Sequence, residues 1–98
     1  MALLIKADGT RVEIKGEKKN GALTWEQVTS AIGGGYVQMV ACDPKITGGY
    51  NRYYCDEEGK LKLFPPNLEA TKLSTYTMPG DVLVGDILFT KGRQGQDR

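Results

Sequence analysis

The sequence predicts an α+β fold in which a mostly antiparallel, twisted sheet is accompanied by one well-defined helix over about residues 24–33. Stretches of alternating apolar and polar residues, bounded by turn residues, predict strands in both halves of the chain. A capping sequence that precedes an amphipathic segment predicts the helix. The order of strands, helix, strands, a short helix over about residues 67–75 and a final strand favours antiparallel pairing over a regular βαβ alternation.

The first two strands are predicted to form a hairpin over residues 2–7 and 10–15. Between them lies Asp8-Gly9, a dipeptide that favours a tight primed turn. On the second strand we expect Val12 and Ile14 to be buried, while the charged residues between them face water. The hairpin therefore has one buried and one solvated face.

The helix is predicted to begin at Thr24, where Thr24 and Gln27 match a capping box. Glycines 33–35 end it, because glycine tolerates the left-handed conformation after a helix. Three apolar residues fall on one stripe, which we expect to face the sheet: Trp25, Val28 and Ile32.

A strand over residues 36–42 is predicted next, and Asp43-Pro44 breaks it. Residues 50–55 and 60–64 are predicted to form a second hairpin around a turn at residues 57–59. Asn67 is expected to cap the short helix. Residues 82–90 form the longest apolar run, predicted as one buried strand in which Gly85 allows a bulge.

The composition fits one soluble domain, which we place at residues 1–90, followed by a flexible polar tail over residues 91–98. The net charge of +1 argues against a nucleic-acid-binding protein, because such proteins carry a strong basic excess. The chain contains no histidine, which excludes Ser-His and Cys-His catalysis and the commonest zinc sites. We expect no enzyme activity, no metal and no cofactor.

Charged residues near the start interrupt any signal peptide or membrane span, so we expect a cytoplasmic protein with no membrane partner. The two cysteines, Cys42 and Cys55, are expected to be reduced thiols on neighbouring strands, because the cytosol keeps thiols reduced.

Four sequence blocks occur in an order and spacing that resemble a domain-of-unknown-function family of small proteins from bacteriophages, plasmids and bacterial mobile elements: ALLIKADG, IGGGYVQMV, DEEGKLKLFPPNLEAT and GDVLVGDILF. The resemblance covers residues 3–89. It implies an accessory role in phage or mobile-element biology and a location in the host cytoplasm, and it carries no enzyme activity. The chain departs from the pattern in the Tyr-rich segment at residues 50–54, and in NLEAT, where a second proline commonly follows the asparagine.

That Tyr-rich segment contains the first candidate binding residues, Tyr50, Arg52 and Tyr54. At a spacing of two they are predicted to share one face of a strand. Two phenol rings that flank a guanidinium could stack on a nucleobase and bind its phosphate. The alternative is a half-buried strand whose tyrosines cover the edge of the core.

Further candidates lie in the glycine turn and at two isolated polar positions. The backbone amides of Gly34, Gly35 and the following Tyr36 could cradle an anion, although a helix C-terminus disfavours anions. Asp86 interrupts an apolar run, so it is expected either to be paired or to contact a ligand. Asn67 completes the candidate set.

The function expected from these observations is a binding module that sequesters a nucleotide-type ligand, such as a host immune signal, without catalysis. Because 98 residues can hardly enclose a nucleotide, we expect a homo-oligomer with the ligand between protomers. The alternative is an inhibitor that docks on a host defence or metabolic enzyme, through a sheet edge or the tyrosines. Binding of DNA or RNA through the tail cations is a weaker third interpretation.

Overall fold

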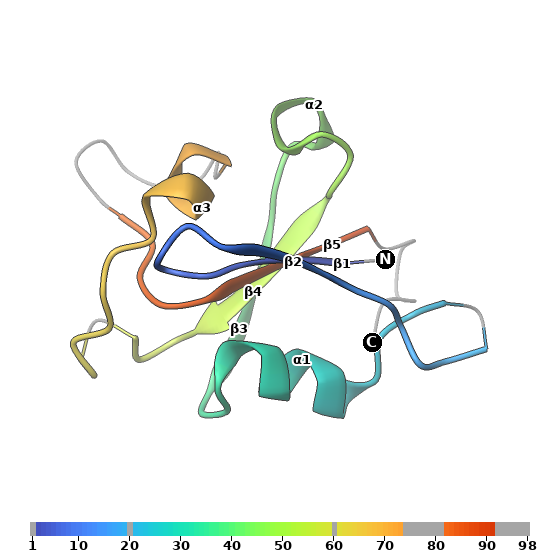
Figure 1. The fold of residues 1–98 in the computed structure, drawn as a ribbon, viewed down its shortest axis with the longest axis horizontal. Coiled ribbons are helices and arrows are strands. Elements are labelled where there is room, and N and C mark those ends of the chain that lie inside the picture. The colour runs from blue at the N-terminus through green and yellow to red at the C-terminus, as the bar shows by residue number, and fades with distance from the viewer. Residues whose placement is uncertain (1, 20, 60, 74–81, 92–98) are drawn as a thin grey trace.

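The computed structural model describes residues 2–19, 21–59, 61–73 and 82–91. Five strands form one fully antiparallel sheet in the order β2-β1-β5-β4-β3, and the main helix packs on one of its faces (Figure 1). The strands are β1 (Ala2–Ile5), β2 (Arg11–Ile14), β3 (Val37–Ala41), β4 (Arg52–Asp56) and β5 (Ile87–Thr90). The predicted α+β fold, with a mostly antiparallel sheet and one main helix, is confirmed.

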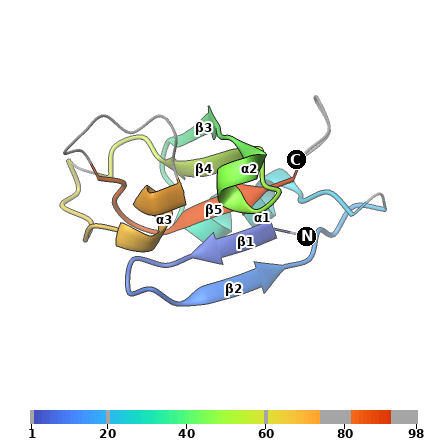
Figure 2. The same ribbon diagram turned by 90° about the horizontal axis from the view of Figure 1, so that it is seen from above.

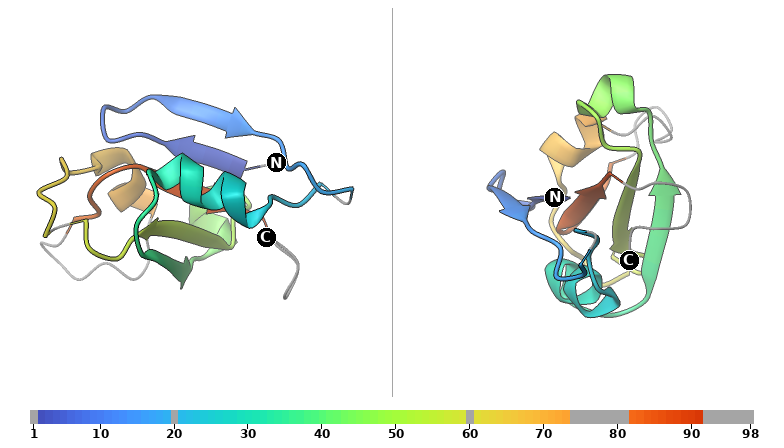
Figure 3. Two further views of the ribbon diagram at one scale, coloured as in Figure 1. Left: turned by 90° about the horizontal axis from the view of Figure 1, so that it is seen from below. Right: turned by 90° about the vertical axis from the view of Figure 1, so that its right-hand side faces the viewer.

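Three helices accompany the sheet: α1 (Trp25–Ile32), α2 (Pro44–Thr47) and α3 (Leu68–Leu73). Helix α1 lies on one face, and the short helices α2 and α3 lie on the other (Figures 2 and 3). No helix among the described residues has the length and apolar character needed to cross a bilayer.

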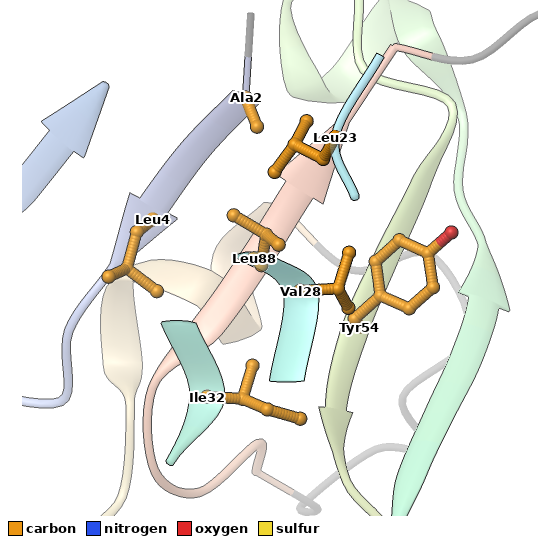
Figure 4. Packing of buried hydrophobic residues seen from close by; sticks show 7 residues of the cluster. All are labelled: Ala2, Leu4, Leu23, Val28, Ile32, Tyr54 and Leu88. Carbon is orange, nitrogen blue, oxygen red and sulfur yellow. The ribbon is translucent and has the colours of Figure 1, made fainter. Parts of the chain in front are cut away.

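The sheet separates two apolar clusters, because alternate strand residues point to opposite faces. Tyr54 and Leu88 belong to the cluster under α1, which Figure 4 shows. Tyr53 and Phe89, their neighbours in sequence, belong to the cluster on the α2 and α3 face. The core therefore has two layers, and the middle strands β4 and β5 contribute to both.

Helix α1 begins and ends as predicted. The Gln27 amide N–H donates to Thr24 Oγ1 at 3.1 Å, and the Thr24 N–H donates to Gln27 Oε1 at 3.0 Å, which completes the capping box. Gly33 ends the helix in the left-handed conformation, with φ of 91°. Trp25 departs from the prediction: it lies on the flank of the helix, 48% exposed, and meets the Tyr54 ring edge-on at 6.5 Å.

The hairpin of β1 and β2 has a longer turn than predicted. The Lys6 N–H donates to Thr10 O at 2.8 Å, so three residues form the loop. Gly9 has φ of 92°, whereas a primed Asp-Gly turn also needs positive φ at Asp8, which is absent. Val12 is 38% exposed, because β2 is an edge strand.

The predicted second hairpin is wrong. β4 pairs with β3 on one side and with β5 on the other, so no edge is left for a return strand. The described residues between 57 and 64 form turns instead. The Asp43-Pro44 pair does end β3, but it also begins α2, since Asp43 Oδ1 accepts a hydrogen bond from the Lys45 N–H at 2.9 Å.

Residues 82–90 do not form one strand. β5 begins at Ile87, after Gly85 takes a left-handed φ of 75° and Val84 makes an isolated bridge to Pro66. Asn67 caps α3 as predicted, through the Ala70 N–H at 3.0 Å. The predicted end of this helix at residue 75 and the predicted tail after residue 91 lie outside the described residues.

Candidate functional site

A pocket of about 270 Å³ opens on the face of the sheet opposite α1, at the end of β4. Gln38 and Cys55, which are register partners on β3 and β4, form its floor with Ile87 of β5. Glu57, Gly59 and Leu61 from the turn after β4 line one side, and residues 82–84 line the other. The pocket thus joins apolar walls to an amide and a carboxylate.

An ion pair lies beside this pocket. Lys62 Nζ is 2.6 Å from Asp56 Oδ2, and the Asp56 side chain is only 4% exposed. Burial is the largest single influence and raises the pKa of Asp56, but the hydrogen bonds from Lys62 and the Glu58 N–H, together with the Lys62 charge, outweigh it, so the pKa of the carboxyl lies below its ordinary value. The Asp56 Oδ1 atom accepts from the Glu58 N–H at 2.9 Å. The pair therefore holds the turn over residues 57–64 against the end of β4.

Cys55 is the nearest nucleophile to the pocket, but it is not activated. Burial, with Asp56 and Glu57 nearby, raises the pKa of its thiol to about 11. Its Sγ lies 3.8 Å from Gln38 Oε1, and both cysteines are free thiols, as expected. Because only the thiolate attacks, this thiol is inert at neutral pH. Within the described ranges, no group of three or more Cys, Asp or Glu side chains could hold a metal ion.

The glycine turn reaches the site, but not as an anion cradle. The Gly34 N–H donates to Thr29 O at 2.7 Å, as in a helix-ending motif, so the predicted free amide at Gly34 is wrong. Gly35 packs on the ion pair: a Cβ there would lie 2.7 Å from Lys62 Nζ and 2.8 Å from Asp56 Oδ2. Tyr36 is 67% exposed, and its carbonyl accepts from the Glu57 N–H at 2.7 Å. Gly35 and Tyr36 thus contact residues next to the pocket, but neither residue lines it.

The structure does not bring Tyr50, Arg52 and Tyr54 together on one open face, so that prediction is wrong. Tyr54 is 1% exposed and packs under α1. Tyr50 precedes β4 and packs on the opposite layer, with its ring 6.3 Å from that of Phe89. Arg52 contacts Met39, with Nη1 3.5 Å from Sδ, at the far end of β4 from the pocket.

Asn67 and Asp86 are engaged with the backbone. Asn67 is fully buried, and its Nδ2 donates to Ile5 O at 2.7 Å and to Gly85 O at 2.9 Å. Asp86 Oδ1 accepts a hydrogen bond from the Ala7 N–H at 3.0 Å, so this carboxylate has a partner within the fold. Both side chains hold segments together and neither lines the pocket.

Several residues of this site were missed by the sequence analysis. Residues 57–59 were predicted as a turn without a role for Asp56, although a lysine six residues after Asp56 was a usable signal for an ion pair. Gln38 carried no signal, because one polar residue on an alternating strand is ordinary. Residues 82–84 line the pocket only because the chain bends at Gly85.

No family model, curated protein or solved structure matches this chain.

Proposed function

We propose that this protein acts by binding and not by catalysis, as a module that captures and sequesters a nucleotide-type ligand. The observation that carries the proposal is the pocket beside β4, which combines apolar walls with two polar lining residues, Gln38 and Glu57. Ligand sites in proteins have this composition, mostly apolar with a few polar groups that orient the ligand.

The chemistry of the pocket suits a nucleobase and its sugar. The Gln38 amide can both donate and accept a hydrogen bond, which matches the edge of a base. Leu61 and Val82 offer apolar contacts to the faces of a ring, and the Glu57 carboxylate can accept from amino and hydroxyl groups. Ligand pockets commonly have volumes above about 300 Å³, so we expect the base and sugar to fill this pocket and the phosphate to extend into solvent.

The absence of catalysis is supported by the same residues. The Cys55 thiol has a pKa of about 11, and the chain contains no histidine that could act as a base. A module that only retains its ligand needs neither. The resemblance to mobile-element proteins suggests the ligand class: a nucleotide signal of the host's immune response, captured in the host cytoplasm.

Titration calorimetry with adenosine, AMP, ADP-ribose and a cyclic dinucleotide tests the proposal. We expect at least one of them to bind, and Leu61→Ala to weaken that binding about 5- to 30-fold, because about 1–2 kcal/mol of apolar contact is lost. Leu63→Ala is the matched control: Leu63 is exposed in the same turn but does not line the pocket. Binding of none of the four ligands, or equal binding by both variants, would contradict the proposal.

The second candidate function is an inhibitor that docks on a host enzyme, and the turn after β4 favours it. Leu61 and Leu63 are 82% and 87% exposed, and Leu63 has φ of 59°, an unfavourable conformation for a leucine. Exposed apolar side chains on a strained turn are typical of contact residues. This candidate predicts that Leu63→Asp abolishes inhibition of an identified target enzyme while small-ligand binding is retained. Inhibition that survives Leu63→Asp excludes the turn as the contact.

A further inference from the structure

The two edges of the sheet differ in how they are protected. An edge strand exposes unpaired backbone groups, and proteins block such edges with charges, prolines or bulges. β2 carries Arg11 and Glu13, and Arg11 also pairs with Glu69 of α3 at 3.2 Å. β3 has the sequence Val-Gln-Met-Val-Ala, with no charge and no proline, and it pairs with β4 in unbroken register. Among the described residues, the β2 edge therefore carries charges that protect it and the β3 strand carries none; the two strands lie at opposite edges of the sheet (Figure 3).

The backbone of β3 presents a regular set of donors and acceptors. The Glu57 N–H donates to Tyr36 O, and hydrogen-bonded pairs alternate along an antiparallel ladder. The even-numbered residues of β3 consequently direct their N–H and C=O groups to β4. The odd-numbered residues direct theirs away from the sheet: Val37, Met39 and Ala41. In the described part of the chain, β4 is the one strand that pairs with β3.

We propose that this edge pairs with the same strand of a second copy of the chain, antiparallel, around a two-fold axis at Met39. Met39 would then lie opposite the partner's Met39, and Val37 opposite the partner's Ala41. Each of the three outward-facing pairs forms two backbone hydrogen bonds, about six in all. The two sheets become one continuous sheet of ten strands, twice the five of a single chain.

The charges at the two ends of β3 favour this orientation. At the Ala41 end lie Arg52, its register partner, and Lys45 of α2, while the Asp43 carboxylate caps that helix. At the other end, Glu57 and Glu58 follow β4, and Lys62 already neutralises Asp56. Antiparallel pairing sets the basic end of each copy against the acidic end of the other. Parallel pairing would place like charges together.

The α1 face beside this edge has the composition of an interface. Met39 is 53% exposed and contacts Arg52. Its register partner on β4 is Tyr54, and the half-exposed Trp25 ring packs against the Tyr54 ring. Trp, Met and Arg are enriched at protein interfaces. On the α1 face, a second copy would cover the Met39 side chain. On the opposite face, it would lie next to Gln38, which lines the pocket.

The test is the mass in solution, measured by analytical ultracentrifugation over a range of concentrations. The natural chain is expected to form a dimer of twice 10.7 kDa. Met39→Lys and Met39→Glu each place two like charges at the axis and are expected to be monomeric, whereas an equal mixture of them should regain the dimer. Val12→Lys, the matched change on the β2 edge, should stay dimeric. Circular dichroism checks that each variant is folded.

Amide hydrogen exchange supplies a readout that needs no variant. With rising protein concentration, exchange at Met39 and Ala41 should slow, while exchange at Arg11 and Glu13 on the other edge should not. A natural chain that stays monomeric, a Met39→Lys variant that stays dimeric, or a mixture that fails to recover the dimer would overturn the proposal. None of these readouts depends on the proposed ligand.

Discussion

Asn67 shows how one side chain can hold three segments of the chain in place. Its amide nitrogen bonds the carbonyls of Ile5 and Gly85, and its oxygen caps α3 at Ala70. All of its side-chain hydrogen-bonding groups are used in a site with no exposed surface. The end of β1, the bend before β5 and the start of α3 therefore depend on the same residue.

Asn67→Ala is expected to destabilise the fold by about 3 kcal/mol, because two buried carbonyls lose their donor and a helix loses its cap. Asn67→Asp keeps the capping oxygen but faces the two carbonyls with a second oxygen, so it should be no more stable than the alanine variant. Urea denaturation measures both. A loss below about 1 kcal/mol for either variant would show that the three segments are held independently.

The sequence predicted the capping role of Asn67, because asparagine before a helix is a local signal. It could not predict the bonds to Ile5 and Gly85, which join residues distant in sequence. The same distinction applies to Tyr50, Arg52 and Tyr54. Their spacing can be read from the sequence. The apolar cluster that Tyr50 or Tyr54 joins, however, depends on the distant residues that pack against it, which are Phe89 for Tyr50 and helix α1 for Tyr54.

At the scale of elements, the turn that joins α1 to β3 is held by glycines with different surroundings. Gly34 and Gly35 have similar backbone angles, with φ of 84° and 81°. A Cβ atom added at Gly34 would have no atom within 4 Å, whereas a Cβ atom added at Gly35 would collide with the Asp56–Lys62 pair. The comparison of the two positions therefore separates backbone strain from steric conflict.

Gly34→Ala is expected to cost about 1–2 kcal/mol, the strain of a left-handed alanine. Gly35→Ala should cost more, since the ion pair must also shift. Thermal unfolding of both variants measures the difference. Equal losses would mean that the Lys62 side chain moves aside freely and that the ion pair does not restrict the Gly35 position.

The Asp56–Lys62 pair gives the stability of this region a defined pH dependence. The pKa of Asp56 is lowered in the fold, so its stabilising effect is present above the ordinary value of 3.8 and is lost as pH falls through the folded value. Asp56→Asn should therefore be less stable than the natural chain at neutral pH, and the difference should shrink below pH 3.8. Melting temperatures of both proteins, measured from neutral to acidic pH, give this difference in stability. A difference that stays constant with pH would show that the Asp56–Lys62 pair is not its cause.

Elements defined by local patterns were predictable. The capping box, the glycine end of α1, the Asp43-Pro44 break and the first hairpin all follow from residues within one or two turns of each other. The second hairpin was wrong because alternating residues identify a strand but not its partner. β4 and residues 60–64 are close in sequence, yet β4 pairs with β3 and β5.

At the scale of the molecule, the fold class followed from the order of elements, whereas the strand order did not. The insertion of β5 between β1 and β4 brings the last strand to the centre of the sheet (Figure 2). This arrangement places Ile87 and the segment before it at the floor and wall of the pocket. Local sequence patterns therefore could not predict this site, and none of the candidate residues singled out from the sequence lines the pocket.

The proposed sequestering function requires that this protein hold a nucleotide-type ligand without changing it. Native mass spectrometry of the protein purified from host cells, followed by denaturation and analysis of what is released, tests this most directly. We expect a bound small molecule with a nucleotide ultraviolet spectrum, released with its mass unchanged and retained in a smaller amount by Leu61→Ala. Protein that carries no small molecule after exposure to the host's nucleotides, or that releases a cleaved product, would contradict it.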